Sequence, residues 1–520
     1  MSTGNSGRLM AALARRHGWL LGALVLVLVL GEVPLVLSVC CAPAGATGLG
    51  TAWFVNDFAQ YESAMRQGAE QPGWLIHDVF TAEPHPAAFM FPLYVGAGKF
   101  AAMLSLPDAA VEHTLGVLTR AALVVALWRF ARAFAAGPAA ARWTFALALF
   151  ASGFEVFAAG AGGGLYTGSW SYETNGFGLL FAAPHVPLAM AATLELARAV
   201  LRPRVGLSPG WLTWVAMLSA AIALLHPFHL PVLLGAAMLA GLVFRLTGRG
   251  RANLAAAFVA FVAALPVLWP TITTFSFEPF WLATYSSQNT LPSPAPHELL
   301  VDLGPTLVLA IGGVAMLRGR VAPFGLLVWL LLSLVAMYVP VPYQRRLSFG
   351  IQPALAVLAA NALTTACASL ETRRATVLRL GVAATAATGT LLILASIVAS
   401  GLRNAPLPIY RSTGDLDAAA TWLDSQARPG DVILADWAAS NYLAPRTPAH
   451  VFGGHPVATL QAASKEFASR SVFAHASSLL VARQLGAQWL VYGPGEADVA
   501  GPAEPAFQSG AVRVYRVRPG

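Results

Sequence analysis

The sequence predicts an α-helical membrane protein that crosses the bilayer about eleven times and ends in a small external α/β domain. Three observations predict this fold class. Of the 520 residues, 57% are hydrophobic and only 11% are charged, whereas soluble domains carry charge on about 25% of their residues. Apolar runs recur along most of the chain, each close to the roughly 20 residues that a spanning helix needs. After Ser400 the composition becomes that of a soluble domain.

Hydropathy marks the candidate spans, and the two that meet at His226-Pro227-Phe228-His229 are short. In order they are Trp19–Val39, Glu112–Ala133, Ala141–Gly160, Phe177–Ala197, Trp211–Phe228, His229–Phe244, Asn253–Ile272, Glu298–Leu317, Val321–Val339, Leu347–Leu370 and Leu378–Ser400. The first has no cleavage site and is too long for the hydrophobic region of a signal peptide, so we expect it to stay in the membrane.

Arginines cluster in every second loop, and by the positive-inside rule these loops are cytoplasmic. The clusters are Arg8, Arg15 and Arg16; Arg129, Arg132 and Arg142; Arg198, Arg202 and Arg204; Arg245, Arg249 and Arg251; Arg318 and Arg320; and Arg373, Arg374 and Arg379. We therefore expect a multi-pass protein of the inner or plasma membrane, with a cytoplasmic N-terminus.

This topology requires that residues 88–106 do not cross the membrane. The segment contains Pro92, Gly96, Gly98 and Lys99, which suits a short helix at the membrane interface. Residues 40–111 then form one large external loop within a membrane domain of residues 1–401. Residues 402–520 form the extracytoplasmic domain.

The positive charge reports topology and not nucleic-acid binding. The net charge is +8 and the isoelectric point is near 9.7, but the arginines lie between apolar runs instead of on one face. We expect no nucleic-acid partner. The three cysteines, Cys40, Cys41 and Cys367, have no metal-binding spacing, and we expect free thiols.

The C-terminal domain alternates helices and strands, as a layered α/β domain does. We expect helices at 415–426, 437–443, 456–469 and 475–484, and strands at 431–435, 450–453, 489–493 and 512–517. It has neither a dinucleotide-binding glycine motif nor a phosphate-binding P-loop. The segment Gly453-Gly454-His455-Pro456 has two interpretations: an ordinary strand-to-helix turn, or a close approach to a ligand.

An arginine pair, Arg345-Arg346, falls on the external side and breaks the charge rule. One interpretation is a clamp for a phosphate, because guanidinium groups bind oxyanions in a bidentate manner. The other is contact with lipid headgroups or with a carboxylate of the C-terminal domain.

Several other polar residues lie in apolar surroundings. His185 and Arg120 fall within spans and therefore need partners, unless Arg120 extends to the interface. His226 and His229 suit a structural role at a helix break. Glu173 lies among aromatic residues, which suits sugar binding, or is one of the scattered polar residues of a glycine-rich loop.

The N-terminal third resembles the GT-C superfamily of integral-membrane glycosyltransferases, and in particular the protein O-mannosyltransferase and lipid A aminoarabinose transferase type. The matching pieces are Asp57, Gly73-Trp74-Leu75, Phe91-Pro92-Leu93-Tyr94, Lys99-Phe100, and Arg129 with Arg132. The C-terminal domain resembles external domains of the same superfamily more loosely, through residues 429–435, Gly454-His455 and Tyr492-Gly493-Pro494.

The resemblance implies transfer of a sugar, with inversion, from a polyprenyl-phosphate donor to a hydroxyl of a lipid, glycan or protein. Asp57 matches the catalytic acid and would act as general base, although an aspartate there also suits a helix N-cap. The leaving phosphate needs cations, which Arg345, Arg346 and Lys99 would supply. Glu83, His85, Tyr94 and Glu173 are the further candidate substrate-binding residues.

Two departures from the pattern affect the donor site. Asp57 is flanked by Asn56 and Phe58 where relatives often have a second acid, and Met90-Phe91-Pro92-Leu93 replaces a Lys-Pro-Pro-Leu motif. Either Arg345 and Arg346 take over the missing lysine's role or the activity differs.

No cofactor is certain. A divalent cation held by Asp57, Glu83 and His85 is an open alternative. Two other function classes are also open: a transporter or flippase of a lipid-linked substrate, and an inactive envelope-assembly protein with the same fold. Transporters usually show internal repeats, and none is evident here.

Overall fold

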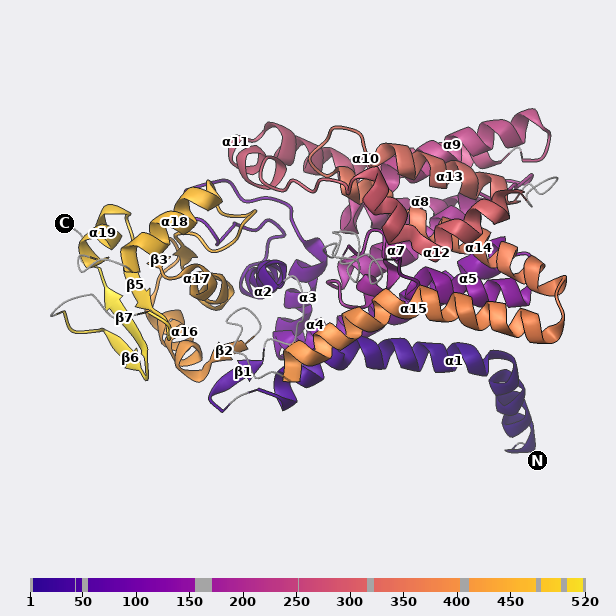
Figure 1. The fold of residues 1–520 in the computed structure, drawn as a ribbon. Coiled ribbons are helices and arrows are strands. Elements are labelled where there is room, and N and C mark those ends of the chain that lie inside the picture. The colour runs from indigo at the N-terminus through magenta and orange to yellow at the C-terminus, as the bar shows by residue number, and fades with distance from the viewer. Residues whose placement is uncertain are drawn as a thin grey trace.

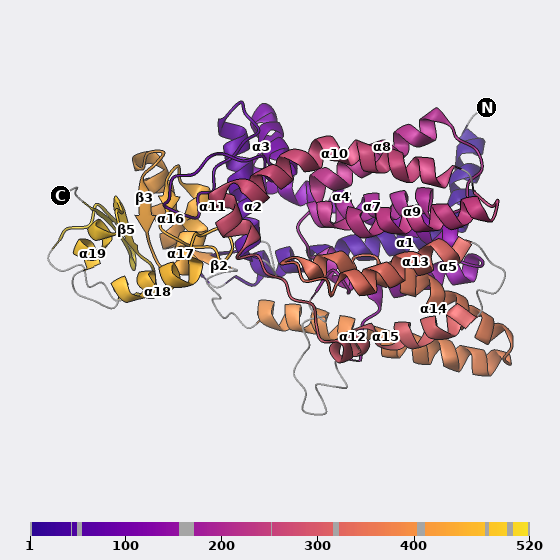
Figure 2. The ribbon, with the colours of Figure 1, turned by 90° about the horizontal axis from the view of Figure 1, so that it is seen from above.

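The computed structural model describes residues 3–42, 44–48, 55–154, 171–250, 252–315, 322–402, 411–473, 478–496 and 503–517. Figure 1 shows a long bundle of helices on one side and a smaller domain with a sheet on the other, with α2 and α3 between them. Viewed from above, in Figure 2, the same two parts lie end to end.

The helical bundle accounts for the apolar runs of the sequence. Its helices are α1 (Thr3–Cys40), α4 (Asp108–Phe134), α5 (Pro138–Phe150), α7 (His185–Val200), α8 (Pro209–Leu225), α9 (Leu230–Leu246), α10 (Asn253–Phe277), α12 (Pro296–Ala315), α13 (Ala322–Ala336), α14 (Ile351–Ala368) and α15 (Thr372–Leu402). Within the described residues, 7 helices are long and apolar enough to cross a membrane, and α8 and α13 contribute shorter apolar helices. The chain is therefore a multi-pass membrane protein, and the predicted fold class is confirmed.

Each expected span coincides with a helix, but several helices differ in length or are broken. In the expected span Ala141–Gly160, the helix α5 ends at Phe150. Residues 155–160 lie outside the described part of the chain. The expected span from Phe177 begins instead with a short 3-10 helix, η2 (Gly176–Leu180), and its α-helix starts only at His185. Pro184 favours this late start, since a helix tolerates proline at its beginning and not in its interior.

The helix α12 is broken at Gly304, whose φ of 40° lies in the left-handed region. A Cβ there would lie 2.6 Å from the Cα of Gly153, so two glycine backbones make contact at the break. Gly304 is followed by Pro305, and a Gly-Pro pair is a sequence signal for such a break.

Buried charges in the bundle are paired. Arg120 of α4 forms an ion pair with Glu32 of α1 and donates a hydrogen bond to the carbonyl of Leu180 at 3.2 Å. At another point, Arg129 of α4 and Arg198 of α7 both pair with Glu195, at 2.9 and 2.5 Å. Two of the arginine clusters assigned to the cytoplasm thus lie at one end of the bundle.

The helices α2 (Val55–Glu70) and α3 (Pro92–Leu104) pack on each other through glycines. A Cβ at Gly98 would lie 1.8 Å from the carbonyl oxygen of Met65, and one at Gly68 would lie 2.3 Å from that of Val95. Only glycine allows this approach. On its other side α3 exposes Phe100, Met103 and Leu104, as expected for a helix at a membrane interface.

The C-terminal domain is a five-stranded sheet of order β4-β3-β5-β7-β6 with helices around it. The strands are β3 (Val432–Leu434), β4 (His450–Val451), β5 (Trp489–Tyr492), β6 (Phe507–Ser509) and β7 (Val512–Arg516). The helices are α16 (Gly414–Gln426), α17 (Trp437–Leu443), α18 (Ala462–Phe473) and α19 (Ser478–Gln484). The main difference from expectation is that residues 456–461 form turns before α18 begins.

Backbone hydrogen bonds join this domain to the loop after α2. The amide of Val451 donates to the carbonyl of Val79 at 2.9 Å, and Thr81 and Gly453 form an isolated antiparallel bridge. Separately, β1 (Ala46–Gly48) and β2 (Arg411–Thr413) pair as an antiparallel ribbon. The domain is thus fixed to two segments that belong to the membrane part.

Candidate active site between the helical bundle and the C-terminal domain

Asp57 lies in the first turn of α2, at the boundary between the bundle and the C-terminal domain. Its side chain is 45% exposed, so it is open to a solvent-borne or membrane-borne molecule. One carboxylate oxygen, Oδ1, lies 3.5 Å from Nε2 of His455, which is buried. A half-exposed carboxylate with a fixed neighbour on one side suits a general base.

Beside Asp57, two tyrosines and a histidine form a wall. Tyr61, one turn further along α2, stacks on Tyr94 of α3 with ring centroids 4.3 Å apart and an interplanar angle of 11°. The hydroxyl of Tyr94 and Nδ1 of His185 form a hydrogen bond of 2.9 Å. His185 therefore has the partner that its place in an apolar span required, and Tyr94 is fixed at both its ring and its hydroxyl.

Arg345 and Arg346 lie on the 3-10 helix η5 (Gln344–Ser348). Arg345 Nε is 3.6 Å from Oε1 of Glu173, whose side chain is 1% exposed. Arg346 lies over the ring of Phe228, with Cζ 4.8 Å from the ring centroid. The Nε atoms of both arginines are buried and have no hydrogen-bond partner among the described residues.

Asp57 and Arg346 act electrostatically on the same tyrosine. Burial raises the pKa of Tyr61 well above its ordinary value, the negative charge of Asp57 raises it further, and the positive charge of Arg346 opposes both effects. Tyr61 is therefore within the electrostatic range of both a carboxylate and an arginine.

Glu83 and His85, both in the loop after α2, are held by neighbouring groups. Lys465 of α18 donates to Glu83 Oε2 at 2.6 Å, and Thr81 also donates to it. Burial alone would raise the pKa of Glu83, but these two hydrogen bonds outweigh it and the pKa is lowered. The ring of His85 stacks on Phe280 at 4.1 Å.

Both ring nitrogens of His85 are engaged. Nε2 accepts a hydrogen bond from the amide of Asp78 at 2.9 Å, so Nδ1 carries the proton and donates to the carbonyl of Glu83 at 2.8 Å. Among the residues that the structure describes, no group of three or more His, Cys, Asp or Glu side chains could hold a metal ion. Asp57, Glu83 and His85 are thus not brought together as metal ligands.

Lys99 of α3 points to the end of α2. Its Nζ donates to the carbonyls of Gly68 and Gln71, at 3.3 and 2.6 Å. These carbonyls lie at the C-terminal end of α2, where carbonyl groups have no hydrogen-bond partner within the helix. In this structure Lys99 therefore caps a helix.

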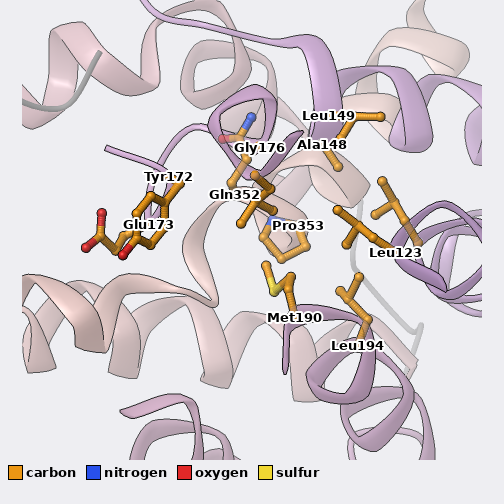
Figure 3. Close-up of a pocket in the computed structure, with 12 residues that line it drawn as sticks. Leu123, Ala148, Leu149, Tyr172, Glu173, Gly176, Met190, Leu194, Gln352 and Pro353 are labelled. Carbon is orange, nitrogen blue, oxygen red and sulfur yellow. The ribbon is translucent and has the colours of Figure 1, made fainter. Parts of the chain in front are cut away.

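A cavity of about 340 Å³, its open mouth included, lies behind Glu173 within the bundle. Figure 3 shows Tyr172 and Glu173 at one end, Gln352 in the middle, and Leu123, Leu149 and Leu194 at the other end. The cavity is therefore mostly apolar, and its polar side chains are Tyr172, Gln352 and Glu173, the partner of Arg345.

Sequence reasoning singled out Asp57, Tyr94 and the arginine pair, but it did not place His455, Tyr61 or His185 in one site. His185 had a signal, since a buried histidine in a span needs a partner. The sequence also indicates Gly453-Gly454-His455-Pro456 as a segment that could approach a ligand, but it does not indicate the contact of His455 with Asp57. The contact with Asp57 joins distant parts of the chain, and no local pattern reports it.

No family model and no curated protein matches the chain, but solved structures do. ArnT from Cupriavidus metallidurans, solved with undecaprenyl phosphate, matches with a TM-score of 0.54 and 14% identity over 92% of this chain and 93% of ArnT. The oligosaccharyltransferase AglB from Archaeoglobus fulgidus matches with a TM-score of 0.50 and 14% identity, over 92% of this chain and 70% of AglB. The arabinofuranosyltransferase AftD from mycobacteria matches with a TM-score of 0.51 and 16% identity, over 96% of this chain and 41% of AftD.

These three proteins are GT-C glycosyltransferases. Since identities of this size carry information on the fold alone, they confirm the resemblance of the sequence at that level. The chain has the GT-C fold of integral-membrane glycosyltransferases.

Proposed function

We propose that the chain transfers a sugar from a polyprenyl-phosphate-linked donor to an acceptor hydroxyl, on the extracytoplasmic face and with inversion. The observation that supports this most is the half-exposed Asp57 in the first turn of α2, in a GT-C fold. The charges of Asp57 and Arg346 both act on Tyr61. Two of the similar structures were solved with polyprenyl phosphates, undecaprenyl phosphate in ArnT and dolichol phosphate in AglB.

Asp57 acts as the general base of this reaction. Its Oδ2 takes the proton of the acceptor hydroxyl while the hydroxyl oxygen attacks the anomeric carbon of the sugar. The bond from this carbon to the phosphate oxygen breaks on the opposite face, and the electron pair leaves with the polyprenyl phosphate. Attack from the face opposite the leaving group inverts the anomeric centre.

Arg345 and Arg346 stabilise the leaving phosphate. The released group gains negative charge as the bond breaks, and preorganised guanidinium groups stabilise such charge most effectively where water is scarce. Both arginines have a buried Nε without a hydrogen-bond partner among the described residues, which supports a role toward an anion. Tyr61 and Tyr94, which are buried and stacked on each other, hold α2 against α3 and so keep Asp57 in place beside the substrate.

Glu83, His85 and Lys99 shape the site in this proposal without contacting the substrate, because their polar atoms already bind neighbouring groups. The part of the chain that the structure describes contains no group of three or more His, Cys, Asp or Glu side chains that could hold a metal ion.

The test uses full-length protein in nanodiscs with a panel of undecaprenyl-phosphate-linked sugars, and measures release of undecaprenyl phosphate. We expect release with one donor in the panel when an acceptor extract is present. Asp57→Asn should abolish release and leave binding of undecaprenyl phosphate unchanged. Arg345→Gln and Arg346→Gln should each weaken that binding.

The other function classes give different results. A transporter would move a labelled donor across a proteoliposome membrane without release of undecaprenyl phosphate. An inactive assembly protein would bind no donor, and Asp57→Asn would change nothing measurable. Transfer that survives in Asp57→Asn would remove Asp57 as the base.

A further inference from the structure

His455 comes from the C-terminal domain, yet its side chain, 1% exposed, lies against α2 of the membrane part. Its Nδ1 accepts hydrogen bonds from the backbone amides of Val457 and Ala458, at 3.1 and 3.0 Å. The side-chain amide of Gln60, one turn after Asp57 on α2, lies 3.1 Å from the same nitrogen. The other nitrogen, Nε2, has no hydrogen-bond partner among the described residues and is 3.5 Å from Asp57 Oδ1.

These contacts fix the tautomer of the imidazole. Backbone amides can only donate, so Nδ1 must offer its lone pair to Val457 and Ala458. The proton of the neutral ring therefore sits on Nε2, the atom that faces Asp57. A proton on Nδ1 would face the N–H groups of Val457, Ala458 and Gln60 and would find no acceptor. The ring therefore keeps the Nε2–H form.

The loop that presents His455 is rigid. A Cβ at Gly454 would lie 2.8 Å from the amide nitrogen of Asn441, and one at Gly453 would lie 2.9 Å from Thr459. The Thr459 hydroxyl accepts from the amides of Gly454 and His455, at 3.1 and 3.0 Å, and donates to the carbonyl of Phe80 at 2.7 Å. The imidazole therefore cannot move away from Asp57 without breaking contacts between the domain and the loop after α2.

We propose that His455 is a positioning residue for Asp57: its Nε2–H holds Oδ1 of the carboxylate and directs Oδ2 to the acceptor hydroxyl. This inference rests on the proposed function and deepens it, because it makes the C-terminal domain part of the active site. The present separation of 3.5 Å shortens to a normal hydrogen bond when substrate fills the site, as catalytic hydrogen bonds often do.

A hydrogen bond to the charged form of a carboxylate favours that form. Loss of this donor should therefore move the acid limb of the pH profile of transfer to a higher pH. Other titratable and charged groups also lie around Asp57. They are Tyr61 on the same helix, Tyr94 on α3, Tyr172 before η2, His185 on α7, Tyr285 on the π-helix η4 (Leu282–Ser286), and Arg346, which acts on Tyr61 from η5.

Two substitutions separate the positioning role from the structural role of the ring. In His455→Asn, Oδ1 takes the place of Nδ1 and keeps the acceptor for Val457 and Ala458, but no donor reaches Asp57. In His455→Gln, an amide N–H reaches as far as Nε2, while the acceptor at Nδ1 is lost. Asp424→Asn is the control, because it removes the 2.6 Å contact of α2 with the C-terminal domain through Arg66 and leaves Asp57 untouched.

The measurement is the pH dependence of kcat/KM for release of undecaprenyl phosphate. We expect the acid limb of His455→Asn to move up by about one pH unit, with about a tenfold loss at pH values below the midpoint of that limb. His455→Gln and Asp424→Asn should keep the acid limb of the unmodified protein. An unchanged acid limb in His455→Asn would overturn the proposal, even if the overall rate falls.

A second measurement does not need activity. In full-length protein with ¹⁵N-labelled histidine, the signals of His455 are those that disappear in His455→Asn. We expect the Nε2–H tautomer, with a shift of the Nε2 signal in Asp57→Asn. An Nδ1–H tautomer, or an Nε2 signal indifferent to Asp57→Asn, would contradict the positioning role. Loss of transfer in Asp57→Asn tests the proposed function separately, so the two ideas can fail independently.

Discussion

Arg345 Nε lies 3.6 Å from Glu173 Oε1, and the Glu173 side chain is almost entirely buried. This pair is the only described salt bridge of either arginine of η5. A lipid phosphate that binds Arg345 must therefore compete with the carboxylate of Glu173 for the same cation.

The first prediction follows from this competition. Glu173→Gln should tighten binding of undecaprenyl phosphate several-fold, because Arg345 then lacks its protein counter-charge. It should also lower the free energy of unfolding by about 3 kcal/mol, the typical cost of leaving one partner of a buried ion pair alone. Binding is measured in nanodiscs and stability by thermal unfolding. The control Glu371→Gln breaks an exposed pair with Arg374 and should change neither, whereas weaker phosphate binding in Glu173→Gln would count against the competition.

The second prediction concerns Asp78, which lies in the loop between α2 and the C-terminal domain. Burial raises the pKa of Asp78 to about 8, while a hydrogen bond from the Phe80 amide and the charge of Lys465 act against this rise. Because the folded pKa lies above the unfolded value, the folded state holds more protons between about pH 4 and pH 8, and its stability falls as the pH rises through that window. The penalty is fully present above about pH 8.

Asp78→Asn should remove this part of the pH dependence and keep an acceptor for the Phe80 amide. Thermal unfolding should show the variant more stable than the unmodified protein at pH 8.5 and similar to it at pH 5. The exposed Asp424→Asn serves as the comparison and should keep the original slope. A parallel pH dependence in Asp78→Asn would show that this carboxyl does not titrate in the window.

The third prediction concerns the contact between α18 and the external loop. Lys465 Nζ donates to Glu83 at 2.6 Å and to the carbonyl of Phe452 at 2.9 Å. Lys465→Met should loosen residues 78–85 from the C-terminal domain, because Glu83 and the buried carbonyl of Phe452 lose their donor. Hydrogen exchange at the Val451 amide, which bonds to Val79, should become at least tenfold faster. Arg470→Met, in the same helix but in an exposed pair with Glu466, should leave exchange unchanged.

The fourth prediction tests the packing that positions Asp57. Gly98→Ala places a Cβ 1.8 Å from the Met65 carbonyl oxygen, so α2 and α3 must separate. We expect loss of transfer activity and a lower melting temperature. Gly381→Ala, within α15 where the site of the added Cβ is open, should keep activity and stabilise the helix slightly. Full activity in Gly98→Ala would mean that Asp57 does not depend on this contact.

Much of the fold could be predicted from the sequence, because spanning helices and layered strands leave strong periodic signals. The helix at 437–443 was predicted residue for residue, and the break at Pro227 was visible as a pair of short spans. What could not be predicted are features set by close packing. The contact of Gly304 with the backbone of Gly153 is one such feature, although Pro305 after Gly304 does signal a break in the helix.

The site was harder to predict for the same physical reason. The sequence offered Asp57, Glu83, His85 and Lys99 as neighbours in one loop, but the structure uses the last three to bind carbonyls, amides and Lys465. The residue that faces Asp57 is His455, which comes from the other end of the chain. Gln60 also contacts His455 and is separated from it by 395 positions. A single sequence carries no signal for a pairing of that length.

The ribbon of β1 and β2 ties the segment after α1 to the segment after α15. During synthesis, β1 stays unpaired until the last membrane helix and β2 have been made. The contact of Asp57 with His455 forms later still, because His455 follows β2 in the chain. If Asp57 is the base that we propose, the nascent chain carries this base before it has the histidine that positions it. Transfer would then reach its full rate only after the ribosome has finished most of the final domain.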